Sequence, residues 1–440
     1  MISKSPSERQ NPMKPGRSRL RTLGLPLIAG VLSLALSACA GSVAGGTSGG
    51  LAGGGGGGYA PGADQATIDA ALADLPEVEL TFQPSAASAA SIQAPSGNVL
   101  AAAIEERSGG KIKVDTVWGQ AIAGYSELFD ALSDGRVDLA LALPVYQPAE
   151  FPATNAVGEA LGGLPSSPYT GEMITNAVGV DVAWNTPQVL QEYEEQSVYP
   201  IAPFIASGGY YSVCTKTGVS ESDYPGRQVR IASKAQSGLM SRIGASPVSM
   251  EYTEAFEAMQ RGTVDCSLAQ LVTAAEGGLF EVAPNIGYMT DTSISRSASS
   301  LVAGKKFAEL PLGYRQIIFD VYADHFHGQL QTGIGGNAAA VTAAKKAGGK
   351  IERFDDALQK DVAAFNSENR KKIAESGIAG DDLAERVEAA ARKWTAKAKE
   401  LGYSDKGTTA DFDEWYDPKS DYRPMGEAVY QDVILPRRPS

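Results

Sequence analysis

The sequence of 440 residues has little of what most enzymes use for catalysis. Its two histidines, His325 and His327, are two residues apart and would point to different faces of a helix, so we expect solvated or capping side chains rather than a metal pair. The chain has no P-loop and no paired-cysteine zinc spacing. Its one Gly-x-Ser-x-Gly string, residues 46–50, lies in a Gly-rich stretch without the strand and helix of a nucleophile elbow. We therefore predict no catalytic residues, no metal site and no cofactor.

Positive charge is scarce outside the first 38 residues. That leader holds six basic residues and one acidic residue, a net of +5, and the whole chain carries −13, so the remainder carries −18. An acidic body repels nucleic acid and anionic membrane, which excludes both as partners through bulk charge. Capture of an anion would need a local cation inside the binding site.

The leader has the pattern of an export signal. Three arginines precede an apolar stretch, residues 23–36, which is shorter than the roughly 20 apolar residues of a spanning helix. The string LSAC at residues 36–39 resembles a bacterial lipobox, in which the cysteine becomes the lipidated first residue of the mature chain. We predict a lipoprotein signal peptide at residues 1–38 and lipidation at Cys39. The alternative is an ordinary cleaved signal with an incidental cysteine.

The remaining cysteines and the Gly-rich stretch complete this picture of an exported chain. Residues 40–58 are nearly all Gly, Ala, Ser and Thr, which cannot bury enough apolar surface to order themselves, so we predict a tether. Cys214 and Cys266 form an even pair in an exported protein, which predicts a disulfide; two buried thiols are the alternative.

The most informative pattern is an internal repeat at a constant offset of 127 residues. Residues 125–143 read YSELFDALSDGRVDLALAL, and residues 252–270 read YTEAFEAMQRGTVDCSLAQ. Each copy is typical of a short helix that ends at a glycine before a buried strand, and each follows an alternating segment, residues 111–117 or 228–232. Two β-α-β units predict two lobes with a ligand cleft between them. One large α/β domain with similar helix caps is the alternative.

Arg230 is the candidate for the local cation. It lies in a strand-like run between Val229 and Ile231, and a buried guanidinium is costly unless an anion meets it. The planar guanidinium group can donate two parallel hydrogen bonds to one carboxylate. The alternative is an arginine on a solvated strand face. Tyr252, which opens the second repeat copy, is either an aromatic wall of the cleft or a half-buried core residue.

Several runs resemble the substrate-binding proteins of tripartite ATP-independent periplasmic (TRAP) transporters. In the second half they are residues 226–231 (GRQVRI), 244–250 (GASPVSM) and 252–265 (YTEAFEAMQRGTVD). In the first half the resemblance follows residues 109–117 and 128–138 and continues to Tyr146, Phe151 and Pro152, and the helical pattern after Leu310 fits too. The resemblance covers residues 78–401.

The resemblance implies roles for single residues. Arg230 matches the arginine that pairs with the substrate carboxylate, and Tyr252 matches an aromatic position near the ligand. Ala269 stands where many members carry a ligand-binding asparagine, so Gln270 or Ser267 would replace it. Further expected ligand-binding residues are Tyr146, Trp118, Tyr210 and Tyr211. The two adjacent tyrosines stand where many members have a second arginine, which favours a monocarboxylate with an apolar or aromatic body over a dianion.

The predicted fold class is α/β, a two-lobed periplasmic-binding-protein-like fold with hinge strands and a long lobe-spanning helix over residues 312–346. The predicted segments are a signal peptide (1–38), a lipidated cysteine and tether (39–63), lobe 1 (64–205), lobe 2 (206–288), a return to lobe 1 with the long helix and C-terminal helices (289–402) and a surface tail (403–440).

The resemblance implies a lipid-anchored solute receptor outside the cytoplasm. It would capture a small organic acid and deliver it to TRAP permease subunits in the cell membrane, with no enzymatic activity and no nucleic-acid partner. The alternatives are a receptor for an ATP-driven importer or a sensor, and a secreted enzyme that acts on a small carboxylate.

Overall fold

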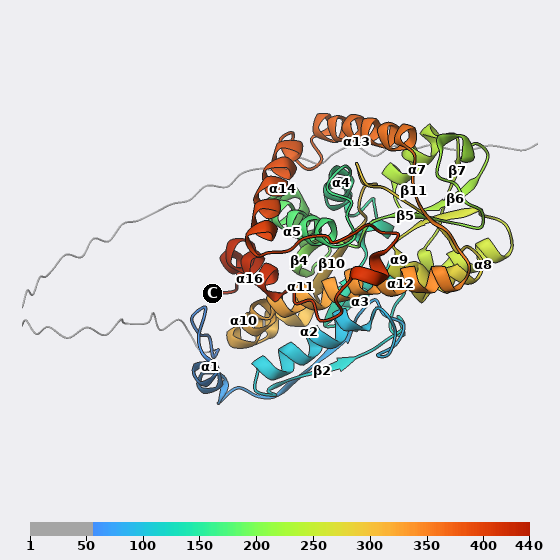
Figure 1. Cartoon of the computed structure of the whole chain (residues 1–440). Helices are drawn as coiled ribbons and strands as arrows, with labels where there is room; N and C mark the ends of the chain where they lie inside the picture. Colours follow the sequence, from blue (N-terminus) through green and yellow to red (C-terminus); the bar gives the residue numbers. More distant parts are fainter. Residues whose placement is uncertain (1–55) are drawn as a thin grey trace, which may run out of the picture. The chain divides into compact units, whose positions relative to one another are not determined.

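The computed structural model describes residues 56–440, which form two β-sheets surrounded by helices (Figure 1). The predicted signal peptide, Cys39 and most of the predicted tether lie outside the described residues. The first sheet has the strand order β2-β1-β3-β10-β4 and the second has the order β11-β9-β5-β8-β6-β7. The first sheet belongs to lobe 1 and the second to lobe 2.

The strands are short and largely buried. In the first sheet they are β1 (Val78–Gln83), β2 (Ile112–Thr116), β3 (Leu139–Ala142), β4 (Tyr199–Ala206) and β10 (Ala298–Ala303). In the second sheet they are β5 (Tyr211–Cys214), β6 (Gln228–Ile231), β7 (Ser246–Ser249), β8 (Cys266–Ala269), β9 (Asn285–Tyr288) and β11 (Ile351–Arg353).

The helices of each lobe lie before, between and after its strands in the sequence. In lobe 1 they are α1 (Gln65–Leu72), α2 (Ala94–Arg107), α3 (Leu128–Asp134), α4 (Pro152–Ala160), α5 (Thr170–Trp184) and α6 (Pro187–Glu195). In lobe 2 they are α7 (Lys234–Arg242), α8 (Ala255–Gln260) and α9 (Leu271–Glu276).

The internal repeat is longer than the sequence indicated. Lobe 1 runs β1-α2-β2-α3-β3 and lobe 2 runs β6-α7-β7-α8-β8, with parallel pairing of the three strands in each lobe. The counterpart of β2 is therefore β7, not the segment at residues 228–232 that we matched to it. We missed β7 because Pro247 interrupts its short alternating pattern. Gly135 ends α3 in the left-handed conformation, as its position after the helix predicts.

Two chain crossings join the lobes. Residues 207–210 lead from β4 to β5, and residues 289–297 lead from β9 back to β10, where β10 pairs antiparallel with β3 and β4. A buried ion pair ties the crossings together: Arg296 Nη2 of the second lies 3.2 Å from Glu172 Oε1 of α5, and the backbone N–H of Gly209 in the first donates to Glu172. A Cβ atom on Gly209 would come within 2.5 Å of Glu172 Oε1, so a larger residue there would displace the ion pair.

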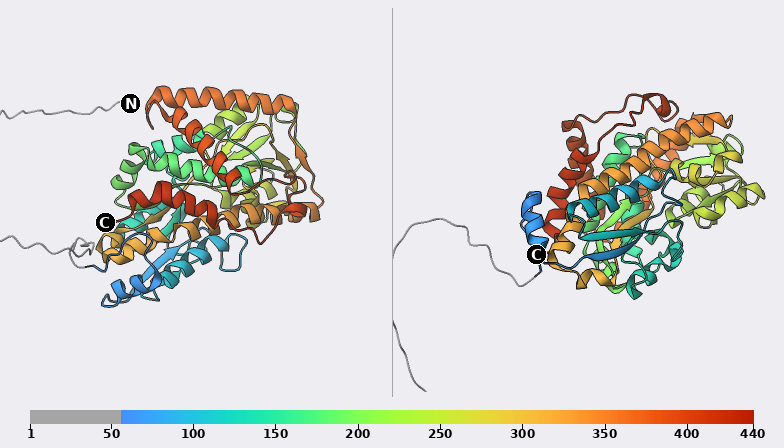
Figure 2. Two further views of the ribbon diagram at one scale, coloured as in Figure 1. Left: turned by 60° about the vertical axis from the view of Figure 1, so that its left-hand side comes forward. Right: turned by 90° about the horizontal axis from the view of Figure 1, so that it is seen from below.

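Helices also bridge the lobes. The predicted helix over residues 312–346 is a run of segments, α10 (Leu312–Asp320), α11 (Tyr322–Leu330), a π-helical turn (Gln331–Gly335) and α12 (Gly336–Lys346). α11 packs on α2 of lobe 1 and α12 packs on α9 of lobe 2. α13 (Asp356–Ser376) contacts both α4 and α7, on the side opposite α2 (Figures 1 and 2), and α14 (Leu383–Glu400) packs on α5.

Three predicted segment assignments need correction. β11 comes from the predicted return segment but pairs with β9 of lobe 2. Residues 147–168, which are rich in Pro, Ala and Gly, carried no helix prediction, but they contain α4, which Pro152 starts at its first turn and whose small and aliphatic residues are buried. Residues 56–63 belong to the folded body rather than to the tether, because the Tyr59 ring is buried and its hydroxyl donates to Asp320 at 2.8 Å.

The predicted surface tail is also part of the core. It contains α15 (Phe412–Trp415), α16 (Arg423–Val429) and a π-helical turn (Tyr430–Ile434), and α16 packs on α11. Phe412, Tyr422 and Met425 are buried. Residues 403–440 also hold several acidic residues, which favoured the prediction of a surface tail, but the aromatic and aliphatic side chains between them face inward. No helix among residues 56–440 has both the length and the apolar character to cross a membrane.

We expected solvated or capping histidines; solvation is wrong for both, while His327 contacts Tyr422, the N-cap residue of α16. Both lie on α11 and are buried: His327 Nδ1 accepts from the Tyr422 backbone N–H at 3.1 Å, and His325 is 2% exposed. Helix α11 has a helix against each side, α2 and α16, so residues two apart are both covered. Burial lowers the pKa of His325 to about 4.

We predict that His325 makes the protein less stable as the pH falls. The imidazole is neutral in the folded state and titrates at its ordinary pKa of 6.5 when unfolded, so its contribution is complete above pH 6.5 and is lost progressively toward pH 4. Between pH 7 and pH 5 the loss is about 2 kcal/mol. Urea unfolding of the wild type and His325→Phe at both pH values measures it. The variant should lose about 2 kcal/mol less than the wild type; equal losses would contradict the assignment.

Candidate functional site

A cavity of about 70 Å³ lies between the lobes, where the carboxyl ends of their parallel strands meet. Ligands of open α/β sheets bind at this position. The residues after the strand ends come from corresponding places in the two lobes. Lobe 1 contributes Ser85 after β1 and Tyr146 after β3, and lobe 2 contributes Ala232 after β6 and Gln270 after β8.

Arg230 lines this cavity from β6 and is 1% exposed. Its Nε and Nη2 donate to the Met250 carbonyl at 3.0 and 2.8 Å, and its Nη1 donates to the Leu268 carbonyl at 3.3 Å. A further Nη2 hydrogen bond, 3.2 Å long, goes to the Tyr146 hydroxyl. All of these acceptors are neutral.

The guanidinium of Arg230 is therefore buried without a carboxylate of the described residues in contact with it, and the more distant Glu251 interacts electrostatically with its charge. In the described part of the chain no carboxylate lies within 4.0 Å of its guanidinium, whereas the equally buried Arg296 has Glu172. A guanidinium has five N–H donors, and four of them are used, which leaves one Nη1 hydrogen for another acceptor. Burial of an unpaired charge is costly, so the site favours an anion.

The Tyr146 hydroxyl adds a second free donor next to Arg230. It accepts from Arg230 Nη2 and from the Tyr252 backbone N–H at 3.1 Å, and its own proton reaches no acceptor among the described residues. Burial raises the pKa of Tyr146, although the Arg230 charge opposes the shift, so the hydroxyl stays protonated at neutral pH. One N–H and one O–H thus converge on the same end of the cavity.

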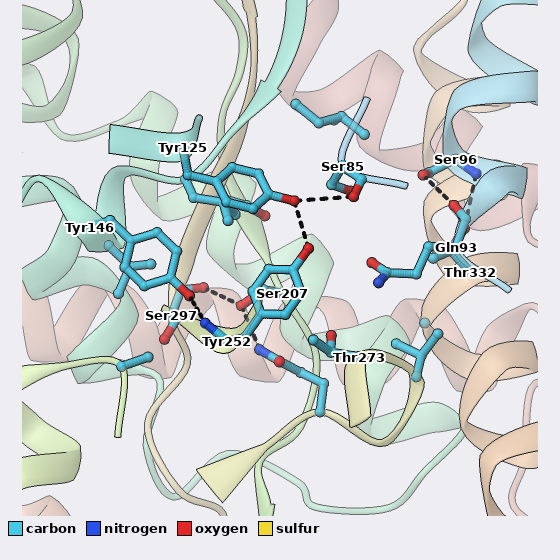
Figure 3. A pocket seen from close by; sticks show the side chains of 18 of the residues that line it. Ser85, Gln93, Ser96, Tyr125, Tyr146, Ser207, Tyr252, Thr273, Ser297 and Thr332 are labelled. Carbon is cyan, nitrogen blue, oxygen red and sulfur yellow. Dashed lines mark hydrogen bonds between the residues drawn. The ribbon is translucent and has the colours of Figure 1, made fainter. Parts of the chain in front are cut away.

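The first residues of the two repeat copies meet across the cleft. The hydroxyls of Tyr125 and Tyr252, 127 positions apart in the sequence, are 2.7 Å from each other (Figure 3). Tyr125 donates to the Ser85 carbonyl at 3.1 Å, and a hydroxyl has one proton, so Tyr252 is the donor to Tyr125. This contact joins the lobes in the closed arrangement that the structure describes.

The structure brings some of the other predicted site residues to the cavity and leaves others outside. Tyr210 lines it and donates to Ser297 Oγ at 2.6 Å, and Gln270 lines it and donates through Nε2 to Ser207 Oγ at 3.1 Å. Tyr211 instead faces the Glu172–Arg296 pair. Ser267 is buried within β8, and Trp118 lies against Gly97 of α2. Neither of these two residues lines the cavity.

Several cavity residues were not predicted. Gln93 and Ser96 come from the start of α2, Thr273 from α9, and Gln329 and Thr332 from the helical run that bridges the lobes. The resemblance that guided our selection assigned them no role. The rule that ligands gather after strand ends would have indicated Ser85 and Thr273, but not residues that a distant helix brings to the cavity.

The disulfide expected between Cys214 and Cys266 is present, with an S–S distance of 2.06 Å. It joins β5 to β8, which are directly paired at these two residues. The bond therefore links the strand that enters lobe 2 to the strand that carries Gln270 at its end.

The fold and the cleft are those of a two-lobed solute-binding protein, and comparison with known proteins agrees. Residues 85–377, well over half of the chain, match the model of bacterial extracellular solute-binding protein family 7 (DctP). The chain belongs to this family, which comprises the solute receptors of TRAP transporters. A solute-binding protein of Albidiferax ferrireducens is 25% identical over 257 residues, which cover 58% of this chain and 73% of that protein.

Solved structures establish the fold. A TRAP solute-binding protein from Rhodoferax ferrireducens with copurified benzoate has a TM-score of 0.64 at 18% identity and covers 73% of this chain and 99% of its own. A marine metagenome TRAP protein with metahydroxyphenylacetate has a TM-score of 0.60 at 19% identity, with coverage of 72% and 99%. The predicted two-lobed fold class is confirmed.

Proposed function

We propose that this protein captures a small organic acid outside the cytoplasm and delivers it to TRAP permease subunits. The observation that carries this proposal is the buried charge of Arg230, which has neutral partners only among the described residues. The ligand carboxylate supplies the missing negative charge. It accepts from the free Nη1 hydrogen of Arg230 and from the Tyr146 hydroxyl.

Ligand capture also closes the cleft. Tyr146 belongs to lobe 1 and Arg230 to lobe 2, so an anion between them contacts both lobes. A ligand that binds the closed state better than the open one shifts the population toward closure. The Tyr125–Tyr252 contact and the bridging helices then hold the lobes together around it.

The lining favours a monocarboxylate with a cyclic or aromatic body. Tyr125, Tyr146, Tyr210 and Tyr252 surround the cavity, and aromatic faces suit flat apolar rings. Arg230 is the one arginine in the cavity lining of the described residues, which suits a single carboxylate. Relatives of the same fold hold benzoate, metahydroxyphenylacetate and pyroglutamic acid.

We predict that Arg230→Ala weakens binding of an organic acid by about 2–5 kcal/mol, because it removes a desolvated charge partner. A thermal-shift screen of organic acids selects the ligand, and calorimetry measures its Kd. The control is Arg261→Ala, which also removes a positive charge from lobe 2 but lies at an exposed position on the surface. Equal affinity of the two variants would show that Arg230 does not bind the carboxylate.

The predicted anchor remains a proposal, because Cys39 lies outside the described residues. We expect the wild-type protein to incorporate a labelled fatty acid and to fractionate with membranes. Cys39→Ser should lose both the label and the membrane association, since no other residue of the signal offers a thiol. A Cys39→Ser chain that still carries the label would contradict lipidation at this position.

A further inference from the structure

Gln93 places an amide without partners at the wall of the cavity. The residue precedes α2, lines the cavity and is 7% exposed. Its backbone carbonyl accepts from Ser96 Oγ at 3.1 Å and from Thr332 Oγ1 at 3.3 Å, so the main chain is held firmly. Its side-chain Nε2 is buried and has no hydrogen-bond partner, and no hydrogen bond to Oε1 occurs among residues 56–440.

This arrangement has a cost that a ligand would remove. A buried polar group without a hydrogen bond has lost its contacts with water and gained none in the protein, which destabilises the folded state. In Figure 3 the amide of Gln93 points toward the part of the pocket where Tyr252 lies. The two tyrosine hydroxyls that lie between Gln93 and Tyr146 already use their protons, because Tyr125 donates to Ser85 and Tyr252 donates to Tyr125. The Gln93 amide is therefore available to a bound molecule.

Gln93 lies away from the end of the cavity where we place the ligand carboxylate. Arg230 and Tyr146 define that end, and Figure 3 shows Tyr146 on one side of the Tyr125–Tyr252 pair and Gln93 on the other. Gln93 belongs to lobe 1, whereas Arg230 belongs to lobe 2. A ligand held at both ends would contact both lobes through polar groups.

An amide offers a donor and an acceptor side by side, and rotation of its terminal bond exchanges them. A hydroxyl group matches both functions, because it donates one proton and accepts through its lone pairs. An apolar ring edge would leave both amide atoms unpaired. A second carboxylate would satisfy the N–H alone and would bring a second negative charge without a second cation.

We propose that Gln93 recognises a hydroxyl group on the ligand, so that the physiological ligand belongs to the hydroxy-substituted cyclic or aromatic monocarboxylic acids. The proposal rests on the function proposed above, with the carboxylate at Arg230. Gln93 then determines specificity within the class of acids that Arg230 admits.

The test compares benzoate with its 2-, 3- and 4-hydroxy isomers by calorimetry on the full mature chain. For the wild type we expect at least one isomer to bind at least tenfold more tightly than benzoate. Gln93→Met keeps the length of the side chain and removes both polar atoms, so it should reduce that preference to less than threefold. Gln191→Met, at an exposed position on α6, is the control and should keep the full preference.

The outcomes separate this proposal from the broader one. It is overturned if the wild type binds no isomer more tightly than benzoate, or if Gln93→Met weakens benzoate and its hydroxy isomers by the same factor, as a purely structural role would require. The proposed function itself fails on a different result, namely an Arg230→Ala variant that binds all of these acids as tightly as the wild type.

Discussion

The proposed binding site depends on one buried positive charge that no carboxylate of the described residues contacts. Arg230 lies within β6, where its guanidinium is fixed by the carbonyls of Met250 and Leu268 and by the Tyr146 hydroxyl. These partners orient the charge but do not cancel it. A bound carboxylate would supply the negative charge that the Arg230 guanidinium lacks. An acidic protein with a net charge of −13 could therefore capture an anion at this one site.

The two-fold repetition of the chain builds the cleft around that charge. Each lobe places the ends of two parallel strands at the cavity, β1 and β3 in lobe 1 and β6 and β8 in lobe 2. The first residue of each repeat copy, Tyr125 or Tyr252, meets its counterpart there. The Glu172–Arg296 ion pair joins the second crossing between the lobes to helix α5. Arg296 has a carboxylate in contact with it, whereas Arg230 has none among the described residues, and this contrast is why we propose the binding role for Arg230.

Much of the fold could be predicted from the sequence, since it follows from local patterns. The constant offset of the repeat indicated two lobes, and an arginine between apolar strand residues indicated Arg230. Burial by distant segments could not be predicted in this way. His325 and the tail residue Tyr422 are buried because α11 and α16 pack together, and Gln93 reaches the cavity because α2 starts beside it. Trp118 and Ser267 do not line the cavity, and the sequence could not indicate this because side-chain direction depends on the packed structure.

The central claim is that Arg230 binds a carboxylate through charge. The most direct measurement compares the best-binding acid with its primary amide, which has nearly the same shape and no charge, by calorimetry on the wild-type protein. The account predicts that the amide binds at least a hundredfold more weakly, which corresponds to about 2.7 kcal/mol or more. An amide that binds as tightly as the acid would contradict it.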